Sequence, residues 1–171
     1  MTESPFPDVR WGSADSRLRK PATAFAASRP GSWMIRSLTP LDRRLLTRTR
    51  GRYTVLGPIG APTLLLTTTG AKSGLPRTSP LLYCRAGARL LVIGSNFGQA
   101  RHPAWTANLL AKPEATVTIG GLDIPVRAEL LAGADRQSGI DTFIELNRVY
   151  AAYLERTDRD IRVFTLEVRA G

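Results

Sequence analysis

Short apolar runs of β-strand length dominate the middle and the end of the chain. Six of them are rich in β-branched or large apolar residues, and they cover residues 63–69, 79–85, 89–95, 114–119, 122–131 and 161–168. Gly87 lies between the second and third runs, and Gly120-Gly121 lies between the fourth and fifth. Because short connections that contain glycine favour hairpins, these runs predict a mainly antiparallel sheet or barrel.

Three other segments carry the signals of helices. Thr39 and Pro40 suit an N-cap and a first helical position, and leucines and arginines follow at helical spacing to about residue 48. Pro103 opens a second helix that ends near residue 112, and Asp135 opens a long helix to about Arg156, before the last strand. Helices inserted among hairpins, without βαβ alternation, predict an α+β fold and not a doubly wound one.

The length and composition fit one compact domain. The chain has 171 residues, of which 43% are hydrophobic and 22% are charged. Residues 1–30 mix Pro, Ser, Ala and Arg without apolar periodicity, which predicts a mobile basic N-terminal arm ahead of a single domain over residues 31–171. No apolar run approaches the ~20 residues that span a bilayer, and the N-terminus lacks the apolar core of a signal peptide, so we expect a cytoplasmic protein.

Cysteine and histidine are too scarce for several kinds of chemistry. The chain contains one cysteine, Cys84, and one histidine, His102. This excludes disulfide frameworks, Cys-His proteases and structural zinc sites, and we expect no metal site. We expect His102, which precedes Pro103, to cap the helix or to pack against its start.

Positive charge is concentrated near the N-terminus. The formal net charge is +10, and residues 1–52 carry +7 of it. Such an excess favours an anionic partner. Residues 33–52 have two interpretations: a helix that packs its leucines on the domain with its arginines in water, or a peripheral contact with an acidic membrane surface. No nucleic-acid partner is expected, because a recognition motif and interleaved aromatic residues are both missing.

One polar stretch has the composition of a phosphate site. Gly70 and Gly74 allow tight turns, so that main-chain N–H groups, Lys72, Ser73 and Arg77 can converge on one anion. The spacing is not that of a Walker A loop, and no helix is expected after it. An ordinary polar loop is the alternative.

Two further stretches hold candidate site residues. Ser95 follows a predicted strand, where functional groups are common, but no GxSxG elbow surrounds it, so a hydrolase is not expected. Trp105 is either a core anchor or the wall of a pocket for a flat ring. Tyr150 and Tyr153 share one helix face and either cover a pocket, donate protons or simply pack.

Four motifs together resemble the deazaflavin-dependent nitroreductase family, whose members use coenzyme F-420. They are TTTGAKSGLPRTSPLLY, VIGSN, RHPAWTANL and TDRDIRVFTLEV, and the resemblance runs from about Arg52 to Val168. It implies an antiparallel split β-barrel, like that of FMN-binding proteins, with a long helix before the last strand. It also implies coenzyme F-420 as the cofactor, with FMN as the second choice.

The resemblance assigns roles residue by residue. Lys72, Ser73 and Arg77 would hold the phosphate and the acidic tail of the coenzyme. The residues that would line the deazaflavin and its side chain are Thr78, Ser79, Pro80, Leu81, Ile93, Gly94, Ser95, Asn96, Ala104, Trp105 and Asn108. Tyr150 would close over the ring, and the catalytic residues Ser95, Tyr150 and Tyr153 would face the electron acceptor.

The activity implied is a reductase that transfers a hydride from reduced coenzyme F-420 to a quinone-like, nitro or other activated acceptor. Asn147 stands where the family members that reduce nitro prodrugs have a tyrosine, and Phe97 interrupts a stretch that is often rich in glycine. Because of these two differences, we do not transfer the acceptor preference of those family members to this chain. The alternative is a non-catalytic barrel protein that sequesters the deazaflavin or a lipid.

Overall fold

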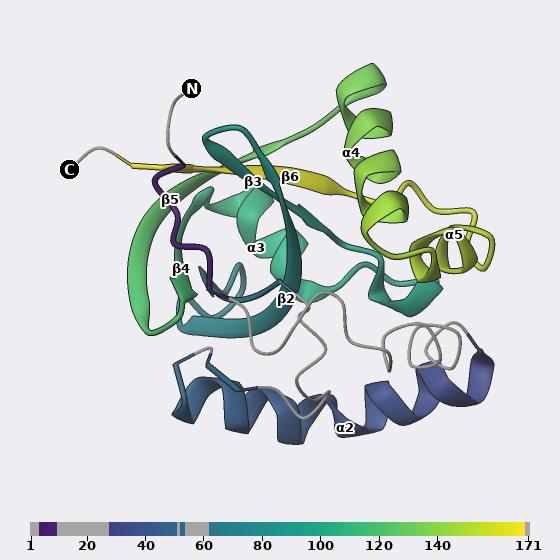
Figure 1. Ribbon diagram of the computed structural model, residues 1–171, viewed down its shortest axis with the longest axis horizontal. Coiled ribbons are helices and arrows are strands. Elements are labelled where there is room, and N and C mark those ends of the chain that lie inside the picture. The colour runs from purple at the N-terminus through teal and green to yellow at the C-terminus, as the bar shows by residue number, and fades with distance from the viewer. Residues whose placement is uncertain (1–3, 10–27, 51, 54–61, 170–171) are drawn as a thin grey trace.

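A closed barrel of six antiparallel strands forms the centre of the computed structural model, which describes residues 4–9, 28–50, 52–53 and 62–169 (Figure 1). The strands are β1 (Thr63–Thr69), β2 (Pro76–Ala86), β3 (Arg89–Ile93), β4 (Glu114–Ile119), β5 (Leu122–Leu130) and β6 (Val163–Val168). Their order around the barrel is β1-β2-β3-β6-β5-β4, and neighbouring strands are antiparallel throughout. The expected antiparallel barrel is confirmed.

Alternation along the strands separates two apolar cores. In β3, Leu90 and Val92 lie in the barrel interior, whereas Leu91 and Ile93 belong to a second cluster outside the barrel. This outer cluster packs between the barrel and the helices α4 (Gly133–Leu146) and α5 (Val149–Leu154). Both faces of β3 are therefore buried, which explains why its sequence is continuously apolar.

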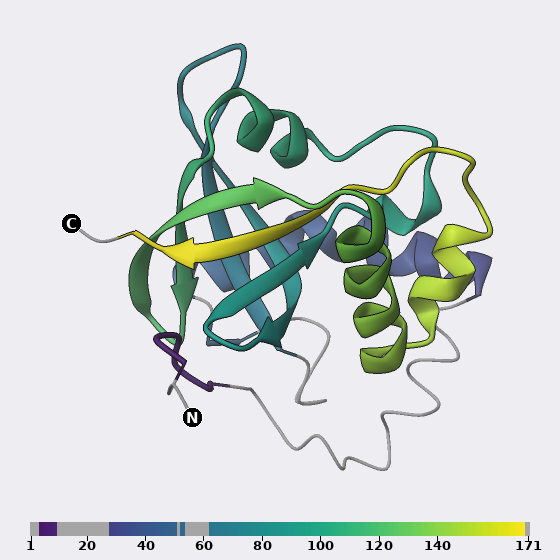
Figure 2. The ribbon, with the colours of Figure 1, turned by 90° about the horizontal axis from the view of Figure 1, so that it is seen from above.

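Two other helices lie on the barrel. Helix α2 (Arg29–Arg48) runs along one side of the molecule and contacts β2, and α3 (Ala104–Ala111) contacts β1 (Figures 1 and 2). Among the described residues, no helix is long and apolar enough to cross a membrane.

Helix α2 begins eleven residues before the position that the sequence pattern predicts. Ser28 caps it by accepting a hydrogen bond from the main-chain N–H of Gly31 at 3.0 Å, and Pro30 occupies the first turn. The predicted start at Thr39 and Pro40 is wrong, because both residues lie inside the helix. Ser28 and Pro30 supply the same N-cap and first-turn signals that Thr39 and Pro40 offer later in the chain.

The predicted long helix before the last strand is divided in two. Asn147 has an extended conformation (φ −158°) at the end of α4, and its side-chain oxygen accepts a hydrogen bond from the N–H of Val149 at 3.0 Å. Such side-chain bonding competes with the helix. Tyr150 and Tyr153 consequently lie on the short helix α5 and not on one long helix.

Part of the predicted mobile arm contacts the barrel. Phe6 is 3% exposed and belongs to the interior cluster, and its carbonyl oxygen accepts a hydrogen bond from Arg85 at 3.0 Å. Around Phe6 the chain is therefore packed, unlike the arm that the sequence predicts. Most of the remaining expected arm lies outside the described residues.

Helix α2 should stabilise the domain through a single buried leucine. Leu46 is 1% exposed, whereas Leu41 on the same helix is 55% exposed. We expect Leu46→Ala to lower the free energy of unfolding by about 2–5 kcal/mol, measured by denaturant unfolding, and Leu41→Ala to change it little. Equal effects would contradict this packing of the helix.

Candidate functional site

The connection between β1 and β2 is a tight loop over residues 70–75. The N–H of Gly74 donates to the carbonyl oxygen of Gly70, and the N–H of Gly70 donates to that of Leu75, both at 2.8 Å. Gly74 has a φ of +67°, and a Cβ on Gly70 would lie 2.6 Å from Ser73 Oγ. The positive φ favours glycine at position 74, and a side chain at position 70 would displace the hydroxyl of Ser73. The loop presents Lys72 and Ser73 to solvent.

Asn108 fixes this loop to α3. Its side-chain oxygen accepts from the N–H of Ala71 and its amide group donates to Thr68 Oγ1, each at 2.9 Å. Asn108 is only 7% exposed. Its polar atoms thus hold the loop in place, a role that the sequence analysis missed because it assigned the residue to the coenzyme.

Lys72 and Arg77 have free charges. Both are exposed, and within the described parts of the chain neither lies within ion-pair distance of a carboxylate. Arg50, Arg89 and Arg127, by contrast, each contact an acidic side chain at 2.7 Å. With the Ser73 hydroxyl between them in sequence, the two cations are available to an anionic group of a ligand.

The end of β3 lies at the same end of the barrel as this loop. The register sets Ile93 opposite Val163 and Thr69 opposite Pro76, and α3 spans the region between the two segments. A Cβ on Gly94 would lie 2.8 Å from Thr106 Cγ2, so β3 and α3 approach closely there. The structure therefore brings together most of the residues expected at the coenzyme: the 70–75 loop, the start of β2, the end of β3 and α3.

These residues differ in how accessible they are. Thr78, Ser79, Pro80 and Leu81 are half-buried on β2, and the hydroxyls of Thr67 and Thr78 are 2.9 Å apart. Ser95 and Asn96 are half-buried after β3, and Ala104 is exposed. Trp105 is buried in the barrel interior with its ring 5.7 Å from that of Phe164, as a core anchor would be.

Tyr150 and Tyr153 lie in the outer apolar cluster, each 6% exposed. Their rings are 6.0 Å apart in an edge-to-face arrangement, and Tyr150 also contacts Phe143 at 5.1 Å. Burial is the main cause that raises the pKa of Tyr150 far above its usual value of 10. In this structure the pair packs, and the phenol of Tyr150 stays protonated at neutral pH.

Arg159 is a residue that the sequence analysis did not single out. Its guanidinium donates to the carbonyl oxygens of Gly94, Ser95 and Gln99 at 3.0, 2.6 and 2.8 Å. It also contacts His102 Nδ1 at 3.1 Å. Main-chain acceptors leave no signature in a sequence, so only the fold reveals this contact.

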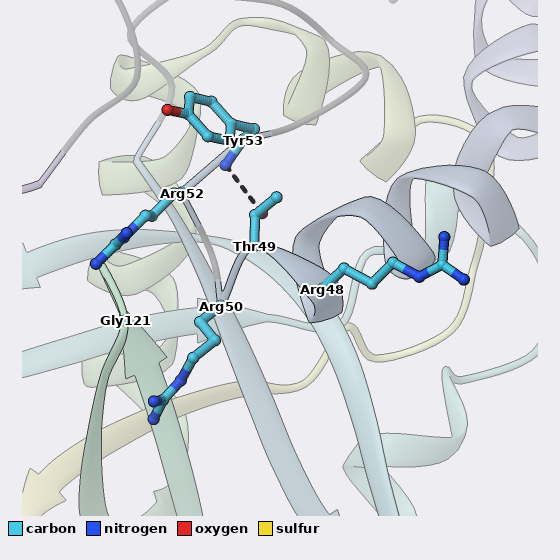
Figure 3. Close-up of a pocket in the computed structure, with 6 residues that line it drawn as sticks. All are labelled: Arg48, Thr49, Arg50, Arg52, Tyr53 and Gly121. Carbon is cyan, nitrogen blue, oxygen red and sulfur yellow. Dashed lines mark hydrogen bonds between the residues drawn. The ribbon is translucent and has the colours of Figure 1, made fainter.

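Two surface hollows lie away from these residues. One, of about 310 Å³, is lined by Arg48, Thr49, Arg50, Arg52, Tyr53 and Gly121. Figure 3 shows that the side chain of Arg48 extends away from those of Arg50 and Arg52. The other, of about 240 Å³, is lined by Pro62, Tyr83, Cys84, Arg85, Thr142, Glu145 and Leu146. Neither hollow includes a residue expected at the coenzyme.

The sequence profile of the F420H(2)-dependent quinone reductase family matches residues 36–168. The chain is 38% identical over 125 residues to an F420H(2)-dependent quinone reductase of Mycobacterium tuberculosis H37Rv, covering 71% of this chain and 83% of that protein.

Two solved structures are similar to this chain in both sequence and fold. An F420-H2 dependent reductase is 36% identical, with a TM-score of 0.57 over 62% of this chain and 94% of that one. A chain described as a domain-swapped dimer is 33% identical, with a TM-score of 0.59 over 81% and 99% of the two chains.

These matches confirm the resemblance, the split barrel and the expected dependence on coenzyme F-420, and they favour an enzyme over a sequestering protein. The chain therefore belongs to the F420H(2)-dependent quinone reductase family and is an F420-dependent oxidoreductase.

Proposed function

We propose that the protein transfers a hydride from reduced coenzyme F-420 to a quinone, with the coenzyme bound at the end of the barrel that holds the 70–75 loop. The observation that carries this proposal is the pair of exposed, unpaired cations Lys72 and Arg77 beside a loop that Asn108 fixes in place. The name of the M. tuberculosis relative supports a quinone as the acceptor.

The acidic part of the coenzyme would be held by three side chains. Lys72 supplies a point charge, and Arg77 can bind a phosphate or carboxylate through two parallel hydrogen bonds. Ser73 Oγ already accepts a hydrogen bond from the N–H of Leu75 at 3.3 Å. Its own hydrogen is therefore available to the ligand. The half-buried residues 78–81, 95 and 96 would form the walls around the ring, whereas Ile93 and Gly94 are buried behind them.

When bound, the coenzyme supplies the hydride from C5 of its reduced deazaflavin. Ser95 would donate a hydrogen bond to the acceptor oxygen on which negative charge develops. Its side chain makes no hydrogen bond to any described residue, while its carbonyl oxygen is held by Arg159. The hydroxyl is thus free to act on a ligand, and its backbone is fixed.

Tyr150 and Tyr153 would form the wall of the acceptor side and not a source of protons. Both are buried, and the raised pKa of Tyr150 opposes release of its proton. Tyr153 also contacts the ring of Phe97 at 5.7 Å, which links the wall to the segment that carries Ser95.

Nitro compounds would be secondary acceptors. Asn147 stands where the resembling nitro-reducing proteins have a tyrosine, and its side chain is engaged with the N–H of Val149. Asn147 lies between α4 and α5 and offers no phenol at this position.

Helix α2 would hold the enzyme against an acidic membrane surface, where quinones dissolve. Trp33 is 62% exposed, and Met34, Leu41, Arg44 and Arg48 are also exposed on α2. Trp33, Leu41, Arg44 and Arg48 follow each other at spacings that place them on one helix face. An aromatic and apolar face with nearby arginines is typical of interfacial helices.

Lys72→Ala and Arg77→Ala should each weaken coenzyme binding by about 1–3 kcal/mol, the cost of losing a hydrogen bond to a charged group. Calorimetric titration of the apo protein with coenzyme F-420 measures this. Arg169→Ala is the matched control, because it removes an exposed cation beyond the far end of β6. Unchanged affinity in both loop variants would remove the proposed tail site.

Ser95→Ala should lower the turnover number with menadione on the order of a hundredfold, the usual cost of losing one donor to a developing oxyanion. Affinity for the coenzyme should stay nearly intact. Absorbance of the reduced coenzyme follows the reaction, with Ser138→Ala on the exposed side of α4 as control. Loss of affinity with normal turnover at saturation would assign Ser95 to binding instead.

Replacing Trp33 and Leu41 together by serine should reduce binding to vesicles that contain phosphatidylglycerol roughly tenfold or more, given about 1.5–3 kcal/mol for each large apolar side chain fully buried. Cosedimentation measures the bound fraction, and vesicles of phosphatidylcholine alone should bind less. Leu130→Ser, an exposed leucine on β5, is the control. Equal binding by the double variant and the control would contradict the proposed contact.

A further inference from the structure

One arginine contacts the connection between β3 and α3 at four positions. Arg159 lies between α5 and β6, and four of its contacts reach residues 94–102. Three of these acceptors are main-chain carbonyl oxygens and the fourth is His102 Nδ1. A guanidinium has five N–H donors in a rigid plane, so one side chain can tie several loop positions together.

The loop that Arg159 holds is strained. Asn96 and Phe97 have φ values of 46° and 56°, a left-handed conformation that asparagine tolerates but that is strained for a bulky residue such as phenylalanine. A Cβ on Gly98 would lie 2.6 Å from the carbonyl oxygen of Tyr153, so the loop also packs tightly on α5. Such a backbone persists only where its surroundings restrain it.

Within the loop, the side-chain amide of Asn96 donates to the carbonyl oxygen of Arg101 at 2.8 Å. This bond closes the loop on itself but does not connect it to the barrel. The N–H of Gly94 donates to the carbonyl oxygen of Arg162 at 2.8 Å, and beyond this main-chain bond Arg159 connects the loop to the segment that leads into β6 at Gly94, Ser95 and Gln99.

His102 completes the contact only when it is neutral. The guanidinium can only donate, so Nδ1 of His102 must accept, and its proton must be on Nε2. Burial, then Arg162 and Arg159, lower the pKa of His102 below its usual 6.5, and Asp160 opposes them. Asp160 itself lies 3.3 Å from Arg136. Protonation would remove the acceptor and set two cations side by side.

We propose that Arg159 is a positioning residue for the reaction: with neutral His102, it fixes the loop of residues 94–102 and so holds Ser95 beside the acceptor. Loss of the Arg159 contacts would let the loop relax from its strained backbone, and Ser95 would move. The positioning role rests on the proposed role of Ser95 in quinone reduction, whereas the hydrogen bonds of Arg159 are independent of that role.

The first test needs no coenzyme. His102 is the single histidine of the chain, so the proton on its imidazole Cε1 gives one resolved signal in proton NMR of the untagged apo protein. Arg159→Gln removes the neighbouring cation, and the pKa of His102 should rise toward 6.5. Hydrogen exchange of residues 94–102 should become faster in the same variant.

Arg136→Gln is the matched control, because Arg136 donates to the carbonyl oxygen of Ile161 at 2.8 Å and so binds the same segment without touching the loop. It should leave the exchange of residues 94–102 as it is, and because it acts on His102 only through Asp160, it should change the pKa of His102 less than Arg159→Gln does. An unchanged pKa and unchanged exchange in Arg159→Gln would overturn the contact, as would equal changes in the two variants.

The second test uses the holoenzyme with menadione. Arg159→Gln should lower the turnover number by up to roughly a hundredfold, the effect of a displacement of about 1 Å at a reacting group. Arg159→Lys should restore part of it, since an ammonium keeps the charge and can reach some of the carbonyls, and Arg136→Gln should not lower it. A faster-exchanging loop with normal turnover in Arg159→Gln would overturn the positioning role.

The pH profile separates this role from a merely structural one. Turnover of the native enzyme should fall as the pH drops through the pKa of His102, and His102→Gln, which cannot be protonated, should lack that fall. An identical acid limb in His102→Gln would overturn the part assigned to His102. If the native enzyme does not oxidise the reduced coenzyme at all, the proposed function fails, while the NMR and exchange results still decide the contact.

Discussion

Closure of the barrel by β6 is the constraint on which the site depends. This last strand pairs with β3 on one side and with β5 on the other, so that neither is left as an open edge. The antiparallel register sets Ile93 opposite Val163. The residues just before β6 must therefore lie beside the residues just after β3, and Arg159 and Arg162 reach Gly94 and Thr106 from there.

The pattern of apolar residues was sufficient to predict the strands, because each strand has at least one buried face and the turns between them carry glycine. It also placed the candidate site residues at strand ends and in one loop, and the structure brings most of them to one end of the barrel. The pattern could not show which of these residues contact other parts of the protein and are therefore not free to contact a ligand. Asn108 and Trp105 have the residue types of a ligand site, but their contacts lie within the fold.

The differences between prediction and structure have local causes. Helix α2 starts at Arg29 because Ser28 and Pro30 offer a cap before Thr39 does, and the pattern contains both signals. The predicted long helix is interrupted at Asn147, whose side chain accepts a hydrogen bond from the N–H of Val149 in place of a main-chain carbonyl. The periodicity of apolar residues does not indicate such a side-chain hydrogen bond. The burial of Phe6 depends on a contact with β2, far away in sequence, which no local pattern contains.

The net charge of +10 has two separate uses that composition cannot distinguish. Arginines such as Arg159 and Arg162 make hydrogen bonds within the fold to neutral carbonyl and hydroxyl groups. Because these partners are not acidic residues, the sequence does not reveal the pairing. Lys72 and Arg77 remain unpaired among the described residues and are therefore able to attract an anion. Because a guanidinium satisfies several acceptors at once whereas an ammonium is a compact point charge, arginine is suited to holding a loop, and an exposed lysine is suited to attracting a mobile anion. Cations whose donors are satisfied by internal acceptors thus hold the loop of residues 94–102, whereas the exposed and unpaired Lys72 and Arg77 remain available to an anion.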